Sequence, residues 1–151
     1  MAATVHASAV LVGARAVLIR GPSGSGKSRL ALELIEAARA GRLRFARLVG
    51  DDRVHLESVG GRLLVRPAAT IAGLLELRGA GLLRLDYEPC AVVGLVVDLD
   101  AADAARLPDE KAVEIGGISL ARLAVAASTP ALPAVLALLT APGAVVDREI
   151  C

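Results

Sequence analysis

Residues 16–28 have the sequence Ala-Val-Leu-Ile-Arg-Gly-Pro-Ser-Gly-Ser-Gly-Lys-Ser, and this stretch decides the fold. Its second part, Gly21-Pro22-Ser23-Gly24-Ser25-Gly26-Lys27-Ser28, fits the phosphate-binding loop pattern G-x-x-x-x-G-K-[ST]. An apolar strand precedes the loop and a helical stretch follows it, which is the setting that the pattern requires. The glycines let backbone N–H groups turn toward a phosphate, and the helix N-terminus adds partial positive charge. The stretch therefore predicts a site for the phosphates of a nucleotide.

Lys27 and Ser28 distinguish this loop from an ordinary glycine-rich turn. The lysine supplies a mobile positive charge for the phosphates, and the serine hydroxyl is expected to ligate Mg²⁺. A glycine-rich turn would explain the glycines, but it would not explain a lysine and a serine at this offset.

Composition indicates a single α/β domain. The chain has 151 residues, 55% of them hydrophobic, which is enough for one buried core. Phe45 and Tyr87 are its aromatic residues, so Leu, Val, Ile and Ala must build that core. This favours a mixed, mainly parallel sheet flanked by helices. We expect the domain to span residues 1–142, and residues 143–151 form a C-terminal tail that is a candidate for disorder.

Charge and hydropathy argue against several function classes. The net charge is +1, and we interpret the arginine cluster in residues 39–47 as a solvated loop rather than a nucleic-acid patch. No export signal begins the chain, and prolines and a glycine interrupt the apolar residues 131–146, so a membrane span is not expected. Cys90 and Cys151 lack metal-binding spacing and indicate free thiols, which predicts a cytoplasmic location.

Hydrophobic patterning divides the chain into short elements. The nearly continuous apolar run at 90–99 predicts a central strand. Helix 130–140 is expected to have Ser128 or Thr129 as its N-cap and Pro130 in its first turn. The other expected elements are strands at 4–11, 15–20, 45–50, 54–58 and 62–66, helices at 28–40 and 71–77, and an apolar segment at 118–125.

Several polar residues outside the loop are candidates for chemistry. Asp51 and Asp52 follow the strand at 45–50, where one could serve a metal through water and the other could take a hydroxyl proton. A turn or a helix-capping pair explains them equally well. Glu76 precedes a glycine-rich turn and is a candidate second metal ligand. His6 and Arg106, taken alone, are better explained as a structural histidine and a surface arginine.

Taken together, these motifs resemble the catalytic domain of the bacterial HPr kinase/phosphorylase family. His6, the loop at 21–28, Leu48-Val49-Gly50-Asp51-Asp52 and residues 75–83 follow in the family's order and spacing. The segment Glu-Leu-Arg-Gly-Ala-Gly-Leu-Leu at 76–83 resembles the family signature Glu-Ile-Arg-Gly-Leu-Gly-Ile-Ile. The resemblance covers roughly residues 4–125 and implies an α/β phosphate-loop kinase domain.

The resemblance also implies a function and roles for single residues. It implies an ATP- and Mg²⁺-dependent kinase that phosphorylates a serine of the phosphocarrier protein HPr, and a homohexamer. Asp52 matches the proton acceptor toward that serine, which acts as an acid in the reverse direction. The other matches are the active-site residues His6, Lys27 and Arg106 and the Mg²⁺ ligands Ser28 and Glu76.

The chain departs from the family pattern in two places. Met1 begins only five residues before His6, so we expect a short form without the family's additional N-terminal domain. The family also has a late Pro-Val-Arg-Pro-Gly-Arg-Asn-like segment tied to dephosphorylation, where this chain has Leu-Ala-Val-Ala-Ala-Ser-Thr-Pro at 123–130. The loss of two basic side chains and a glycine weakens the expectation of phosphorylase activity.

The leading hypothesis is therefore a serine kinase acting on HPr or a close relative. Two alternatives stay open at this stage. A small-molecule kinase would also use a phosphate loop and an acidic pair after the next strand. A regulatory module that binds ATP without catalysis is the third hypothesis, although Lys27, Asp52 and Glu76 argue against it.

Overall fold

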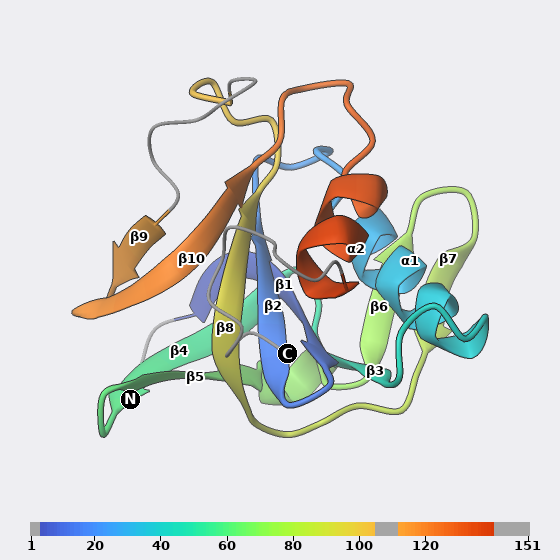
Figure 1. The fold of residues 1–151 in the computed structure, drawn as a ribbon. Helices are drawn as coiled ribbons and strands as arrows, with labels where there is room; N and C mark the ends of the chain where they lie inside the picture. Colours follow the sequence, from blue (N-terminus) through green and yellow to red (C-terminus); the bar gives the residue numbers. More distant parts are fainter. Residues whose placement is uncertain (1–3, 105–111, 141–151) are drawn as a thin grey trace.

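The structure is a computed structural model, and it describes residues 4–104 and 112–140. Within these residues, strands outnumber helices (Figure 1). The elements are β1 (Thr4–Val12), β2 (Arg15–Arg20), α1 (Lys27–Arg39), β3 (Ala46–Gly50), β4 (Arg53–Val59), β5 (Arg62–Pro67), the 3₁₀ turn η1 (Ala69–Ile71), β6 (Leu74–Leu77), β7 (Gly81–Arg84), β8 (Ala91–Asp98), β9 (Ala112–Ile115), β10 (Ile118–Ala124) and α2 (Leu132–Thr140).

The main sheet is mixed, as predicted, but it is not mainly parallel. Its strand order is β2-β1-β4-β5-β8-β10-β9, with β3 beside β1, and β8 also pairs with β2, so part of the sheet closes on itself. Among the described strands, only β2–β8 and β8–β10 pair in parallel. Short glycine turns explain the correction, because Gly13 lies between β1 and β2, and Gly60-Gly61 lie between β4 and β5. A two-residue turn can only join antiparallel neighbours.

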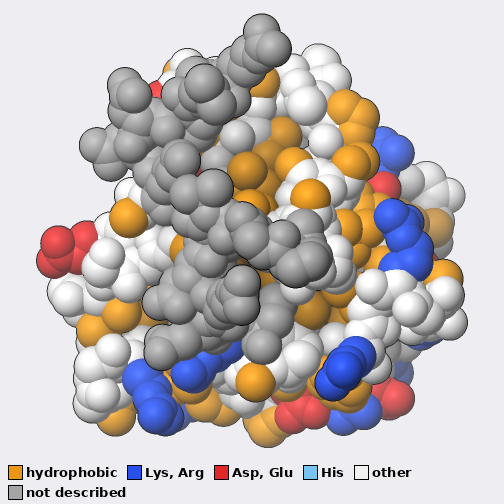
Figure 2. Space-filling model, in the orientation of Figure 1, with side chains coloured by type: hydrophobic (Ala, Val, Ile, Leu, Met, Phe, Trp, Pro, Cys, Tyr) orange, Lys and Arg blue, Asp and Glu red, His pale blue; other side chains and the backbone are white. Residues whose placement is uncertain are grey.

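Apolar side chains form two separate cores. The first lies between the sheet and both helices and includes Leu34 of α1 and Val135 of α2. The second contains no helical residue and is built from strand residues, many of them alanine or valine, such as Ala9 and Val65. Figure 1 shows α1 and α2 together on one side of the sheet, so both described helices cover the same face. In the same view, hydrophobic side chains show around the centre and to its right, and Lys and Arg side chains lie toward the lower and right edges (Figure 2).

Strand β8 occupies the central position that its apolar sequence predicted. It pairs with β2, β5 and β10, and Leu95, Val96 and Val97 are fully buried. The predicted strands near residues 4–20 and 45–66 and the first helix are also confirmed to within a few residues. The apolar segment at 118–125 forms β10.

Two predicted helices need correction. Residues 71–77 end a 3₁₀ turn and then form β6, which pairs with β7 in a two-stranded sheet. Alternation decides the outcome, since Leu75 is fully buried whereas Glu76 is exposed. Helix α2 begins at Leu132 and not at Pro130, because the Ala131 carbonyl accepts the first helical hydrogen bond, from Val135 N–H. Pro133 therefore occupies the first turn, where a missing N–H costs nothing.

Two earlier expectations concern the chain as a whole. None of the helices in residues 4–104 and 112–140 is long and apolar enough to cross a membrane. The predicted domain boundary at residue 142 and the tail at 143–151 lie outside the described residues.

Candidate active site

The phosphate loop connects the end of β2 to the start of α1. Gly26 occupies the N-cap position with φ of 100°, and no side chain caps the helix there, so the first N–H groups of α1 are left for another acceptor. Gly21 is needed for close packing, because a Cβ at this position would lie 2.5 Å from Ser25 Oγ and 3.1 Å from Leu99 O. The Ser25 hydroxyl is buried and has no hydrogen-bond partner within the described part of the chain. The loop thus presents polar donors without protein acceptors.

Lys27 is held inside this loop. Its side chain is 6% exposed, and Nζ donates to the carbonyl oxygens of Gly21 at 2.8 Å and Pro22 at 3.1 Å. An ammonium group has three protons, so this arrangement leaves one for a further acceptor. The buried charge adds to the positive end of α1 and makes the loop a site for anions.

Asp51 connects the loop to the neighbouring strands. It is 3% exposed, and its carboxylate accepts hydrogen bonds from Ser28 Oγ at 2.7 and 2.8 Å, from Ser8 Oγ at 2.6 Å and from Glu76 N–H at 3.1 Å. The carboxylate thereby joins β1, α1 and β6 at one point. Ser28 and Glu76, the two predicted metal ligands, are both tied to it.

Asp52 points the other way and contacts His6. Asp52 Oδ1 lies 2.6 Å from His6 Nε2, and the two side chains are 59% and 45% exposed. Asp52 has φ of 67°, in the left-handed region, so the chain turns between the two aspartates and gives them different surroundings. The sequence left open which aspartate could take a proton, and the geometry favours the exposed Asp52 over the buried, fully bonded Asp51.

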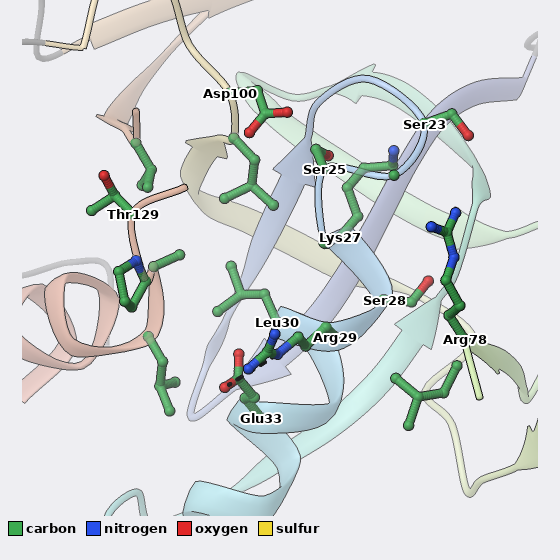
Figure 3. Close-up of a pocket in the computed structure, with 18 of the residues that line it drawn as sticks. Ser23, Ser25, Lys27, Ser28, Arg29, Leu30, Glu33, Arg78, Asp100 and Thr129 are labelled. Carbon is green, nitrogen blue, oxygen red and sulfur yellow. Dashed lines mark ion pairs between the residues drawn. The ribbon is translucent and has the colours of Figure 1, made fainter. Parts of the chain in front are cut away.

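These residues line one cavity of about 960 Å³. It extends from the phosphate loop past Leu30 to Leu99, Asp100 and the segment at 125–133 that leads into α2. Figure 3 shows Arg78, from the turn after β6, and Thr129, from the approach to α2, on opposite sides of the loop and the first turns of α1. Among the described residues, the non-glycine residues with left-handed φ are Asp52, Asp100 and Ser128, and all three line this cavity. Unfavourable backbone geometry of this kind clusters at functional sites.

Comparison with known proteins places the chain in a family. The model of the HPr serine kinase C-terminal domain family matches residues 1–88, more than half of the chain. The chain belongs to this family. Proteins named HPr kinase/phosphorylase are 40% identical over 79 residues in Clostridium beijerinckii (52% of this chain, 24% of that protein) and 40% identical over 101 residues in an Exiguobacterium species (62% and 30%). The chain thus spans less than a third of the length of these relatives.

A solved structure supports the same fold. The HPr(Ser) kinase/phosphatase from Coxiella burnetii superposes with a TM-score of 0.72 at 22% identity, covering 90% of this chain and 87% of that one. The α/β fold with a mixed sheet and few helices is therefore the fold of this kinase domain family.

The family implies Mg²⁺, and the oxygen atoms near the loop fit this ion. Ser28 uses its single hydroxyl proton on Asp51, which leaves its oxygen lone pairs for a cation. Glu76 is exposed, and it lines the same cavity. Within the described ranges, no group of three or more His, Cys, Asp or Glu residues could hold a metal by itself. Ser28 and Glu76 could supply two oxygen ligands to Mg²⁺, which usually binds through one or two protein groups plus substrate phosphates and water.

The structure brings together the predicted site residues that it describes. His6, residues 21–28, Asp52 and Glu76 have atoms on the cavity or in the loop beside it. Arg106 lies outside the described residues. Sequence reasoning missed Ser8 and Arg78 as parts of the site, although Ser8 lies two residues after His6 and strand alternation would have placed them on the same face.

An ion-pair network joins the ends of β2, β8 and β10 next to the phosphate loop. Arg20, the residue before Gly21, holds Asp98 with two hydrogen bonds of 2.7 and 2.9 Å. Arg122 joins the same carboxylate at 2.6 Å and also Asp103 at 2.7 and 3.0 Å. Burial raises the pKa of Asp98, but the hydrogen bonds and charges of Arg20 and Arg122 outweigh it, so the pKa lies below its ordinary value. The network ties β2, β8 and β10 together where they reach the cavity.

Asp98→Asn should destabilise the protein in a pH-dependent way. The pKa of Asp98 is lowered in the folded state, so the ionised carboxylate stabilises the fold above the unfolded-state pKa of about 4 and loses this effect as the pH falls through the folded-state value. We expect a loss of about 2 kcal/mol at pH 7, less than for a fully buried pair. Urea unfolding from pH 7 to pH 3 should show the difference from wild type shrinking in acid. Asp86→Asn, an exposed carboxylate outside the cavity lining, is the control. A difference that stays constant down to pH 3 would contradict the assignment.

Proposed function

We propose that this domain transfers the γ-phosphoryl group of ATP to a serine hydroxyl of HPr or a closely related phosphocarrier protein. One observation carries the proposal: the His6–Asp52 pair, at 2.6 Å, lines the same cavity as the phosphate loop. A proton acceptor next to a phosphate site is what transfer to a hydroxyl needs. The family membership and the names of the relatives point in the same direction.

Each residue has a chemical task in this proposal. The N–H groups of the loop and Lys27 hold the β- and γ-phosphates of ATP and oppose the charge that develops on them. Asp52 accepts the proton of the serine hydroxyl while the serine oxygen bonds to the γ-phosphorus and the bond to the β-phosphate oxygen breaks, releasing ADP. His6 keeps the Asp52 carboxylate oriented toward the acceptor. Ser28 and Glu76 would hold Mg²⁺, and the bound ion would neutralise part of the negative charge of the phosphates.

The cavity supports the kinase direction over phosphorolysis. By resemblance, residues 123–130 correspond to the family's basic late segment. The cavity-lining residues from 125 onward are Val125, Ala126, Ser128, Thr129, Pro130, Ala131, Leu132 and Pro133, none of them charged. Attack by inorganic phosphate on phosphoserine would bring a second anion into this site, and no cation of that segment would receive it. We therefore propose a kinase with weak phosphorylase activity.

Further parts of the proposal rest on the family resemblance. We extend to this chain the use of ATP with Mg²⁺, a homohexameric assembly, a cytoplasmic location and a catalytic role for Arg106. The net charge of +1 gives no support to a nucleic-acid partner. Sedimentation analysis of the purified chain checks the assembly independently of activity.

The deciding experiment is transfer of labelled phosphate from Mg-ATP to purified HPr. Label on a serine of HPr supports the proposal, and subsequent addition of inorganic phosphate should release little pyrophosphate. Label on a metabolite hydroxyl but not on HPr would favour a small-molecule kinase. Binding of ATP without transfer to any acceptor would favour the regulatory module, and both of these outcomes would overturn the proposal.

A further inference from the structure

Two alternate residues of strand β1 contact the neighbouring aspartates Asp51 and Asp52. His6 and Ser8 are two positions apart, so they face the same side of β1. His6 contacts Asp52 at 2.6 Å, and Ser8 contacts Asp51 at 2.6 Å. A backbone contact adds to these two side-chain contacts, because Ala7 N–H donates to the Asp52 carbonyl at 3.1 Å. One segment of β1 therefore positions the proposed base and the buried carboxylate beside it.

Ser8 is the buried member of this arrangement. It is 0% exposed, and its hydroxyl proton goes to Asp51 Oδ1. Ser8 Oγ also accepts a long hydrogen bond of 3.4 Å from the backbone N–H of Asp52. A hydroxyl can donate once and accept twice, so a single oxygen bonds to both aspartates. Alanine at this position would remove both bonds.

The orientation of the Asp51 carboxylate depends on Ser8. Ser28 Oγ lies almost equally far from its two oxygens, at 2.7 and 2.8 Å, so this contact does not fix the rotation of the carboxylate. Ser8 contacts Oδ1 alone and Glu76 N–H contacts Oδ2 alone, and these two bonds hold the plane of the carboxylate in one orientation. A fixed carboxylate in turn fixes the direction of the Ser28 hydroxyl proton, and hence of the lone pairs that face the cavity.

We propose that Ser8 is a positioning residue, which acts through Asp51 on the cation-binding oxygen of Ser28 and through the Asp52 backbone on the proton acceptor. The inference rests on the proposed function for its effect on transfer, but its effect on Mg²⁺-dependent nucleotide binding does not require the acceptor to be HPr. Residues that orient metal ligands in this indirect way typically change metal affinity or activity by about 10- to 100-fold when removed.

Ser8→Ala is the main test. It should raise the Mg²⁺ concentration for half-maximal transfer by about 10-fold and lower kcat by a similar factor. The affinity for a fluorescent ATP analogue without Mg²⁺ should change less than twofold, because Lys27 and the loop N–H groups are untouched. Ser8→Thr keeps the hydroxyl and should recover most of the Mg²⁺ response. Should Ser8→Ala fail to fold, Ser8→Cys keeps the volume with a much weaker donor and is expected to show the same shift.

The matched control is Ser58→Ala. Ser58 Oγ also makes a short hydrogen bond, 2.6 Å to the Gly116 carbonyl, but the residue does not line the cavity. This variant should keep the wild-type Mg²⁺ response and kcat.

The binding measurement separates the failure of this inference from failure of the proposed function. If the wild type binds Mg-nucleotide but does not phosphorylate HPr, the proposed function fails, and the Mg²⁺ dependence of nucleotide binding in Ser8→Ala still decides the role of Ser8. An unchanged Mg²⁺ dependence in Ser8→Ala would overturn the inference. The inference would also be overturned if Ser8→Ala lost thermal stability and activity but kept the wild-type Mg²⁺ dependence. That result would indicate a structural role only.

Discussion

Asp52→Asn is expected to lower phosphoryl transfer to HPr by about 10²- to 10⁴-fold, the usual contribution of a general base. The amide keeps the shape of the side chain but does not accept a proton at neutral pH. Asp52 is exposed and pairs with His6, whereas the carboxylate that holds Ser28 of the loop belongs to Asp51, so nucleotide binding should be nearly unchanged. The measurement pairs initial transfer rates at saturating Mg-ATP with the dissociation constant of a fluorescent ATP analogue.

Two variants make this result specific. Asp86→Asn removes an exposed carboxylate outside the cavity lining and should transfer phosphate at the wild-type rate. His6→Gln should cause a smaller loss than Asp52→Asn, because it removes the orienting contact of 2.6 Å but leaves the proton acceptor. An Asp52→Asn protein that loses binding and transfer equally would contradict the assignment of Asp52 as the base.

The fold could be predicted where local rules decide the structure. Gly13 and Gly60-Gly61 fix tight turns, and the run before Gly21 together with Lys27 fixes the strand, loop and helix. The direction of most strand pairs could not be predicted from composition, because valine-rich strands occur in parallel sheets and also in closed antiparallel ones. The helix prediction for residues 71–77 failed for a related reason. The apolar residues around Glu76 suit a helix or a strand, and only pairing with β7 decides between them.

In the candidate site, too, some features could be predicted from the sequence and others could not. Each of its motif residues was visible in the sequence, but the separate surroundings of Asp51 and Asp52 depend on a left-handed φ at Asp52 and on Ser8 from a distant strand. Ser8 belongs to no motif, and its spacing of two residues from His6 indicates only that both face the same side of the strand, not that Ser8 contacts Asp51. The sequence also could not predict that residues 125–133 line the cavity, because a loop before a helix has no periodic pattern that places it against α1.

Lys27→Met should give the second large loss, about 10²- to 10³-fold in transfer, comparable to removing one donor that stabilises transition-state charge. Unlike Asp52→Asn, it should also weaken nucleotide binding, because the ammonium faces the phosphates in the ground state as well. The free protein should lose stability too, since the Gly21 and Pro22 carbonyls lose their donor, at about 1–3 kcal/mol for groups left unsatisfied. Transfer assays, nucleotide titration and urea unfolding measure the three effects.

The stability effect is what makes Lys27→Met informative beyond activity. Lys27 is 6% exposed, and its Nζ donates to two carbonyl oxygens of the loop itself, so the loop is organised around the ammonium group. Arg62→Met, on an exposed strand residue outside the cavity lining, controls for the loss of one positive charge and should be silent in all three measurements. If Lys27→Met keeps wild-type stability but loses binding, the carbonyl contacts are dispensable and the loop is organised by its glycines alone. If it keeps binding and transfer, the phosphate loop is not the nucleotide site, and the proposed function fails with it.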